Sequence, residues 1–308
     1  MAGICEGRVV VITGAGGGIG REHALAFARE GAKVVVNDLG GSRDGTGGDA
    51  GPAQQVVDEI VAMGGEAVAN TDDISSWDGA ERLVKQAIDT YGTLHVLVNN
   101  AGILRDRMLA NMTEAEWDAV ITVHLKGTFA PTRHAVGYWR DQSKAGTPVD
   151  ARVINTSSSS GIFGNVGQSN YGAAKAGIAA FTVITSQELG RYGVTVNAIA
   201  PTALTRMTED LEVMKSISDS GKESGFDMLA PDNISPLVVY LGSESSREIT
   251  GRVFSVVGGQ VNVVEGWANG PGADKGAKWE PGELAEVLPD LVRQAAPNAD
   301  QSGKRPAQ

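Results

Sequence analysis

Short apolar, β-branched runs alternate with longer segments of helical periodicity along most of this chain. The runs that predict strands are Val9–Ile12, Lys33–Asn37, Glu66–Ala69, Leu94–Asn99, Arg152–Thr156, Val194–Ile199 and Arg252–Val257. The segments between them that predict helices are Ile19–Glu30, Gln54–Met63, Trp77–Tyr91, Glu114–Tyr138, Tyr171–Arg191 and Pro231–Leu241. This alternation predicts an α/β fold, a doubly wound parallel sheet of about seven strands with helices on both faces. Such a sheet binds ligands at the carboxyl ends of its strands.

Two stretches depart from this rhythm. Gly40–Pro52 is rich in Gly and Asp and predicts a loop after the second strand, and from about Gly266 the chain is rich in Gly, Pro and Ala. There is no internal repeat and no second core pattern, so we expect one domain over residues 1–265 and a partly ordered extension over 266–308. The final residues, about Ala296–Gln308, are expected to be disordered.

Composition narrows the classes of function. The formal net charge of −11 argues against sequence-independent nucleic-acid binding, although a few local donors are enough for a small anionic ligand. No apolar run approaches the roughly 20 residues of a membrane helix, and no metal site is expected. Cys5 is the single cysteine, which favours a reducing compartment. The chain enters a strand within a few residues and ends in Arg-Pro-Ala-Gln, so we expect a cytoplasmic protein.

A glycine-rich turn joins the first predicted strand to the first predicted helix. Thr13–Gly20 reads Thr-Gly-Ala-Gly-Gly-Gly-Ile-Gly, with Gly14, Gly18 and Gly20 at the positions that permit a tight turn and a close approach. A strand-to-helix turn of this kind directs free backbone amides at a diphosphate above the helix terminus. The alternative interpretation is a flexible glycine loop without a ligand.

An acidic residue ends the second predicted strand. Asp38 lies 18 residues beyond Gly20, close to the spacing at which a carboxylate accepts hydrogen bonds from an adenosine ribose. The same carboxylate repels a 2′-phosphate, so it favours NAD over NADP as the cofactor. Two alternatives stay open: a turn-forming role for Asp38 before the following glycines, and binding of a 2′-phosphate by Arg21 or Arg43.

One tyrosine is paired with a lysine at helical spacing. Of the five tyrosines only Tyr171 has a lysine four residues on, Lys175, so the two side chains share a helix face. A phenol with a pKa near ~10 needs about 4 kcal/mol to act as a base at neutral pH. An ammonium about 4 Å away at an effective dielectric near 20 supplies roughly that amount. Ser157–Ser160, after the fifth strand, offers hydroxyl donors or simply strand-end turn residues.

Together these motifs resemble the short-chain dehydrogenase/reductase family, which has a single Rossmann-type domain. The resemblance rests on Thr13–Gly20, Asn99–Gly102 and the Tyr171/Lys175 pair in this order, and it covers about residues 6–265. It implies catalysis by Ser158, 13 residues before Tyr171, together with Tyr171 and Lys175. It also implies a set of cofactor-binding residues: Gly14, Gly18, Ile19, Gly20, Asp38, Asp73, Asn100, Ala101, Gly102, Tyr171, Lys175, Pro201, Thr202 and Thr205. In this set Asp73 meets the adenine and Lys175 also binds the nicotinamide ribose.

His124 departs from the general family pattern. The family usually has an asparagine in an Asn-x-x-Gly motif after the fourth strand, where it supports a proton-relay water, and this chain has His124 before Gly127. His124 is therefore a candidate catalytic residue, and the alternative is a buried, hydrogen-bonded structural histidine.

Several segments resemble one branch of the family, the (3R)-hydroxyacyl-CoA dehydrogenase unit of peroxisomal multifunctional enzyme type 2 (17β-hydroxysteroid dehydrogenase type 4). They are Val34–Gly41, Asn99–Arg107, Val123–Gly127 and Gly161–Tyr171. The branch resemblance implies NAD-dependent oxidation of a 3-hydroxyacyl-CoA. It also implies a homodimer or homotetramer assembled through the long helices near Glu114–Tyr138 and Tyr171–Arg191. Basic residues available to an acyl-CoA, or to ordinary solvated surface, are Arg105, Arg107, Lys126 and Arg206.

Three alternative functions remain at this point. A hydroxysteroid or other secondary-alcohol dehydrogenase uses the same chemistry without CoA. A 3-oxoacyl-carrier-protein reductase usually prefers NADPH, against which Asp38 counts. A non-catalytic NAD-binding scaffold keeps the cofactor and loses the chemistry, against which the Tyr171/Lys175 pair counts.

Overall fold

The computed structural model describes residues 3–41, 44, 46–47, 51–205, 216, 218–221, 223 and 225–306. In that part of the chain, one sheet has the strand order β3-β2-β1-β4-β5-β6-β7-β8. The strands are β1 (Val9–Thr13), β2 (Lys33–Asn37), β3 (Glu66–Asn70), β4 (Val96–Asn99), β5 (Ala151–Thr156), β6 (Val194–Thr202), β7 (Val253–Val257) and β8 (Gln260–Val264). β1 to β7 are parallel, which confirms the predicted doubly wound fold.

The sheet has one strand more than the sequence pattern predicted. β8 runs antiparallel to β7 after a tight turn at Gly258 and Gly259, and most of its residues are exposed. A five-residue edge strand after a strand already counted carries too weak a periodicity to be recognised as separate.

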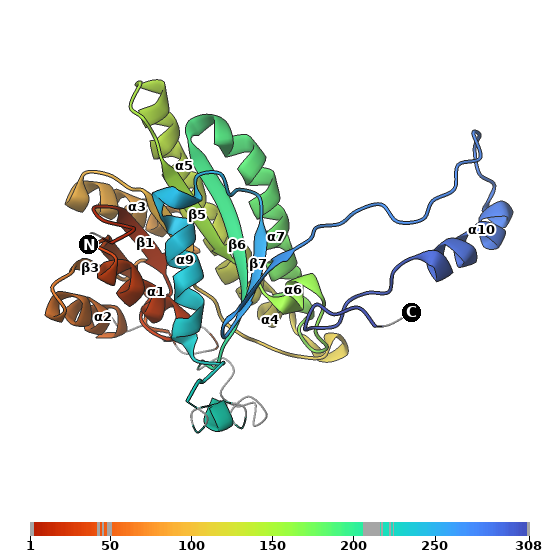
Figure 1. Ribbon diagram of the computed structural model, residues 1–308, viewed down its shortest axis with the longest axis horizontal. Helices are drawn as coiled ribbons and strands as arrows, with labels where there is room; N and C mark the ends of the chain where they lie inside the picture. The colour runs from red at the N-terminus through yellow and green to blue at the C-terminus, as the bar shows by residue number, and fades with distance from the viewer. Residues whose placement is uncertain are drawn as a thin grey trace.

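Helices cover both faces of the sheet (Figure 1). On one face, α1 (Gly18–Arg29), α2 (Gly51–Ala62) and α9 (Ser235–Gly242, preceded by the short η4 helix Pro231–Ile234) pack against the strands around Phe27 and Ile60. On the other, α3 (Trp77–Tyr91), α5 (Gly127–Lys144) and α7 (Ser169–Leu189) pack around Leu83 and Trp139. The central strands therefore lie between two apolar layers, which explains why they read as unbroken apolar runs.

The single helix predicted over Glu114–Tyr138 is divided in the structure. α4 (Glu114–Ile121) starts at a capping box between Thr113 and Glu116, and a π-helical turn, η2 (Thr122–Lys126), separates it from α5. Hydrophobic periodicity does not distinguish a π turn from the α-helix around it. Such turns often occur at functional sites, and this one carries His124.

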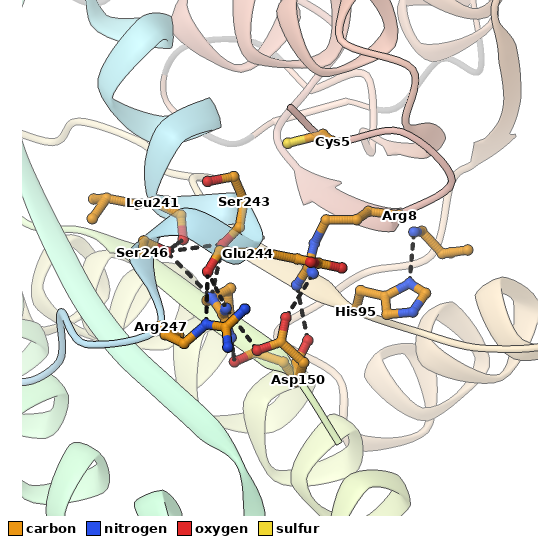
Figure 2. A network of polar contacts seen from close by, with 12 residues as sticks. Cys5, Arg8, His95, Asp150, Leu241, Ser243, Glu244, Ser246 and Arg247 are labelled. Carbon is orange, nitrogen blue, oxygen red and sulfur yellow. Dashed lines mark hydrogen bonds and ion pairs between the residues drawn. The ribbon is translucent and has the colours of Figure 1, made fainter. Parts of the chain in front are cut away.

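A network of charged groups lies at the amino ends of the strands. Arg8, before β1, and Asp150, before β5, point toward each other (Figure 2), and Arg8 Nη1 donates to Asp150 Oδ2 over 2.8 Å. Arg152, in β5, pairs with the other carboxylate oxygen at 2.7 Å and also donates to the carbonyl oxygen of Ser243 and to Ser246 Oγ. These ion pairs and hydrogen bonds hold together the segment before β1, the start of β5 and the segment after α9.

The chain beyond β8 leaves the sheet as an extended arm (Figure 1). The arm carries α10 (Pro281–Gln294), none of whose residues is buried, and the chain then returns to lie beside α6 (Ser159–Ile162). The division into a domain over 1–265 and an extension over 266–308 stays a prediction. No helix in the described part of the chain is long and apolar enough to cross a membrane.

Candidate active site

The glycine turn lies at the carboxyl end of β1, where the parallel topology predicts a ligand site. Gly14 has a φ of +64°, and a Cβ atom there would lie 2.7 Å from the backbone of Ala101. Asn100 Nδ2 donates to the carbonyl oxygens of Thr13 and Gly14, so the segment after β4 clamps the turn. Gly20 packs under the turn, where a Cβ atom would lie 2.5 Å from Asn100 Nδ2.

The amino terminus of α1 suits a negatively charged group. Its N-cap is Gly17, which contributes no side-chain hydrogen bond, and its first turn contains no acidic residue. The first amides of the helix are therefore not capped by a side chain, and the helix dipole is not offset. These are the features of a diphosphate-binding turn.

Asp38 lies beside this turn, as its position at the end of β2 predicts. Its Oδ2 accepts from the Gly16 amide at 2.8 Å, and its Oδ1 accepts from the Gly40 amide at 2.7 Å. The side chain is half-buried, so it lies against the turn rather than in solvent.

Ser158 and Tyr171 meet at the carboxyl end of β5. Ser158 is the N-cap of α6, and Tyr171 is the third residue of α7. Burial and the charge of Asp106 raise the pKa of the Tyr171 phenol, whereas the Ser158 hydroxyl lowers it. Burial is the largest effect, so the pKa of Tyr171 rises to about 12.

The contacts of Lys175 differ from those that its spacing to Tyr171 predicted. The Lys175 Nζ atom is 5.5 Å from the centroid of the Tyr171 ring and donates to the Thr156 carbonyl oxygen at 2.6 Å. Burial lowers the pKa of the lysine itself to about 7. The ammonium is therefore directed at the end of β5 rather than at the phenol oxygen, and the expectation that Lys175 alone brings the tyrosine near neutrality is wrong here.

His124 lies in contact with both halves of the site. Its ring is edge-on to Tyr171, with centroids 5.1 Å apart, and a Cβ atom on Gly102 would lie 2.3 Å from its Cε1. Nε2 is 2.8 Å from the Ile103 carbonyl oxygen, and Nδ1 is buried without a hydrogen-bond partner among the described residues. Burial and the Lys175 charge lower the pKa of His124 to about 3, so the ring is neutral at physiological pH.

The remaining residues of the predicted cofactor set lie at or near the carboxyl edge of the sheet. Thr205 is 3.6 Å from the position of a Gly18 Cβ atom, and Pro201 and Thr202 end β6. Ile19 packs on the core below the turn. Asp73, three residues after β3, is exposed and accepts from the amide and hydroxyl of Ser75.

The basic residues considered for an acyl-CoA have varied surroundings. Arg107 pairs with Glu116 at 3.0 Å, and Arg105 donates to the Asp44 carbonyl oxygen. Lys126 is exposed, and Arg206 lies outside the described residues.

Sequence reasoning missed Asn170, which is fully buried directly before Tyr171. Its Nδ2 donates to the carbonyl oxygens of Arg105 and Glu116, and its Oδ1 accepts from the Tyr171 amide at 2.7 Å. An asparagine at the start of a helix was the available signal, but its partners come from segments more than 50 residues away. It fixes the first turn of α7 and therefore the Tyr171 backbone.

Comparison with known proteins agrees with this geometry. The family model described as short chain dehydrogenase matches residues 8–215. The chain belongs to the short-chain dehydrogenase family. Members of this family are oxidoreductases that act on CH–OH groups with a nicotinamide cofactor, so the enzyme class expected from the sequence is confirmed.

Individual short-chain dehydrogenases show how far the similarity extends. The chain is 45% identical over 296 residues to the hydroxyacyl-CoA dehydrogenase ChsB1 of Mycobacterium tuberculosis, covering 92% of this chain and 88% of that protein. It is 43% identical over 288 residues to mouse peroxisomal multifunctional enzyme type 2, covering 94% of this chain and 36% of that one. A crystal structure of a short chain dehydrogenase from Mycobacterium avium superposes with a TM-score of 0.86 at 56% identity, covering 97% and 99% of the two chains. The resemblance to the multifunctional-enzyme unit is thereby confirmed.

Proposed function

We propose that this protein interconverts a 3-hydroxyacyl-CoA and the 3-oxoacyl-CoA with NAD. The observation that carries the chemistry is that Ser158, Tyr171 and Lys175 lie together at the sheet edge that also holds the glycine turn, with the Lys175 Nζ atom 5.5 Å from the Tyr171 ring centroid and the Ser158 hydroxyl lowering the pKa of the phenol. The substrate class is supported by the names of the relatives that share most of this chain.

The residues present fit a nicotinamide dinucleotide. The uncapped terminus of α1 suits the diphosphate, and the cradle at Gly14 and Gly18 is a space that side chains would fill. Asp38 suits an adenosine ribose and opposes a 2′-phosphate. Asn100, Ala101, Gly102, Lys175 and the end of β6 complete the proposed cofactor-binding set. When bound, the nicotinamide accepts a hydride from the alcohol carbon or returns it to the ketone.

The side chains of this site handle the proton and the substrate oxygen. In alcohol oxidation, deprotonated Tyr171 takes the hydroxyl proton while Ser158 donates a hydrogen bond to the same oxygen as it becomes a carbonyl. In ketone reduction, the neutral phenol gives the proton back. His124 fills the space between Gly102 and Tyr171 as a neutral ring, and we assign it a positioning role in this set.

The pKa of Tyr171 predicts a direction for the pH dependence. Because burial raises this pKa to about 12, the free enzyme holds a neutral phenol at physiological pH. The turnover rate of alcohol oxidation is therefore expected to rise with pH into the alkaline range, whereas ketone reduction proceeds near neutrality. Bound cofactor changes the surroundings of the phenol, so the profile is to be measured with saturating NAD.

The test is a steady-state assay that offers NAD and NADP separately with short, medium and bulky 3-hydroxyacyl-CoA substrates, and with a free hydroxysteroid. Turnover of an acyl-CoA with a strong preference for NAD is the expected result. Turnover of the steroid alone would remove CoA from the proposal and keep the chemistry. A relative named 3-oxoacyl-[acyl-carrier-protein] reductase, from Synechocystis, is 40% identical over 260 residues, so a carrier-protein substrate with NADPH belongs in the same assay.

The cofactor preference has its own variant. Replacing Asp38 by Ser removes the charge that opposes a 2′-phosphate, so the ratio of kcat/KM for NAD to that for NADP is expected to fall at least tenfold. An unchanged ratio would mean that Asp38 acts only as the cap of Gly16 and Gly40.

The proposal includes a homo-oligomer and a cytoplasmic location. Large apolar side chains are exposed on the outer face of α3, α5 and α7, among them Trp77, Phe129 and Ile184 at 43%, 43% and 55% exposure, which supports association through the long helices. Light scattering at several concentrations tests the assembly. Cell fractionation tests the location, which the single cysteine favours.

A further inference from the structure

The loop between the two proposed catalytic residues is rich in glycine. It follows α6, of which Ser158 is the N-cap, and leads into α7, which carries Tyr171, so it connects the two elements that hold the hydroxyl and the phenol. Gly164 and Gly167 have φ values of +86° and +84°, a backbone region open mainly to glycine. Such a segment loses much conformational entropy when it orders, so its position depends on the contacts that hold it.

Three side-chain amides connect this loop to a carboxylate and to the end of the chain. Gln168 Nε2 donates to Asp106 Oδ2 at 2.7 Å, and Asn165 Nδ2 donates to Gln168 Oε1 at 2.9 Å. Gln301 Nε2 in turn donates to Asn165 Oδ1. We call Gln301, Asn165, Gln168 and Asp106 the amide chain.

The carboxylate of Asp106 fixes the orientation of all three side-chain amides. An ionised carboxylate only accepts, so Gln168 must present its NH₂ group to Asp106 and its oxygen to Asn165. Asn165 must then direct its NH₂ group at the Gln168 oxygen and its own oxygen at the NH₂ group of Gln301. Hydrogen bonds aligned in one direction strengthen one another, and the one to the charged group is the strongest.

The far end of the amide chain lies next to a turn with hydrogen bonds of its own. In the C-terminal turn, Asp300–Lys304, the Asp300 amide donates to the Lys304 carbonyl oxygen at 2.8 Å, and Asp300 Oδ1 accepts from the Ser302 amide at 2.8 Å. Gly303 lies against the ring of Phe163, where a Cβ atom would be 3.1 Å from Cζ. The turn therefore touches the loop at two places, Phe163 and Asn165.

The near end of the amide chain is connected to the helix that carries the phenol. Asp106 accepts from Gln168, the N-cap residue of α7 three positions before Tyr171, and its charge raises the pKa of the phenol. The other groups that act on the ring are Ser158, Lys175 and His124. The Arg107 amide also donates to the Gly167 carbonyl oxygen at 2.8 Å, which ties the segment after β4 to the same loop.

We propose that Asp106 and Gln168 are positioning residues for Tyr171, and that the C-terminal turn holds the loop between Ser158 and Tyr171 in place through Asn165. This inference rests on the proposed catalytic roles of Ser158 and Tyr171. The contribution of the end of the arm reaches the Tyr171 helix through side-chain amides rather than through direct contact.

The test compares four full-length proteins: Gln168→Leu, Gln301→Leu, the double variant, and Gln294→Leu as a matched control at an exposed position in the same arm. We expect kcat/KM to fall about tenfold for Gln168→Leu and about threefold for Gln301→Leu. Because both residues act through one chain, the double variant should match Gln168→Leu alone. The control should equal the wild type, and the Kd for NAD should be unchanged in all four. Multiplying effects in the double variant, or a silent Gln168→Leu, would overturn the proposal.

Two further readouts separate this inference from the proposed function. Hydrogen–deuterium exchange over residues 161–169 is expected to increase in Gln301→Leu and not in Gln294→Leu, whatever substrate the enzyme uses. Asp106→Asn removes a negative charge that raises the pKa of the phenol, so the acid limb of the kcat/KM profile should move to lower pH, and a merely structural role would not move it. Unchanged exchange in Gln301→Leu would show that the turn does not hold the loop.

Discussion

Lys175, in α7, and Arg152, in β5, are both buried basic side chains, with 3% and 1% of their surface exposed, and their polar contacts lie at opposite ends of the parallel strands. Arg152 pairs with Asp150 and donates to several backbone oxygens in the network of Figure 2. Lys175 donates to one carbonyl oxygen, and no ion pair to it is found among the described residues. A buried charge without a carboxylate is costly, and burial lowers the pKa of Lys175 accordingly.

The difference separates a structural end of the sheet from a reactive one. At the amino ends of the strands, Asp150 pairs with both Arg8 and Arg152, and these ion pairs offset part of the cost of burial. At the carboxyl ends, burial displaces the pKa values of Tyr171, Lys175 and His124, and no ion pair to Lys175 is found among the described residues. Groups kept in an unfavourable protonation environment are typical of active sites, since a ligand or substrate can supply the missing partner.

The largest expected effect is the loss of activity in Tyr171→Phe. Removing the proton donor and acceptor should lower kcat about 1,000-fold. The Tm should stay within a few degrees of the wild-type value, because the ring remains packed against His124. Steady-state kinetics and a thermal melt check both statements. Wild-type turnover with an unchanged pH profile would show that Tyr171 is not the acid–base group.

The second-largest expected effect is a loss of protein stability from a substitution at the amino ends of the strands. Arg152→Met leaves Asp150 with one arginine partner and removes one donor from each of the carbonyl oxygens of Ala151, Ser243 and Glu244. We expect the free energy of unfolding to fall by about 3 kcal/mol, with kcat/KM unchanged per folded molecule. Urea unfolding and kinetics measured on the same preparation separate the two quantities. A large loss of kcat/KM in folded protein would contradict the division between the ends.

The third effect concerns the sign of the pH dependence. The pKa of Lys175 falls from 10.5 in the unfolded chain to about 7 in the fold, so the fold is penalised below pH 7 and the penalty disappears toward pH 10.5. Lys175→Met should therefore be more stable than the wild type at pH 6, with the difference shrinking by pH 10. Chemical denaturation at pH 6, 8 and 10 measures it.

Asp150 is the control for this experiment, because its pKa shift stabilises the fold instead of penalising it. Its two arginine partners hold the pKa of the carboxyl below its usual value, so the stability that it contributes is present above pH ~4 and is lost as the pH falls further. The difference between the wild type and Asp150→Asn should therefore shrink in acid. An equal stability difference at every pH for Lys175→Met would mean that the lysine titrates normally.

The smallest effect tests one hydroxyl of the structural network. Ser246 Oγ accepts from Arg152 Nε at 3.2 Å and donates to the Leu241 carbonyl oxygen at 2.7 Å. Ser246→Ala should cost about 1 kcal/mol of unfolding free energy, since the guanidinium keeps its other acceptors. Denaturant titration resolves a change of this size. A cost as large as that of Arg152→Met would show that the network depends on this hydroxyl.

Most of the fold and most of the proposed site could be predicted from patterns within short segments of the sequence. The parallel sheet follows from alternating apolar runs, and Thr13–Gly20, Asp38 and the Tyr171/Lys175 spacing lie within short segments. Features set by distant partners were missed: Asn170 bonds to Arg105 and Glu116, and Lys175 turns to Thr156 rather than to the phenol. The π turn at His124 and the edge strand β8 differ too little in periodicity from their surroundings.

The burial of Cys5 has a practical use. Cys5 is the only cysteine of the chain, its side chain is fully buried, and burial raises the pKa of its thiol to about 12. The thiolate that reacts with maleimides and iodoacetamides is therefore almost absent in the native protein. Val166, 83% exposed in the glycine-rich loop, is a position where a Val166→Cys substitution would create a single reactive thiol. A fluorophore attached there would report movements of that loop without removing the native cysteine.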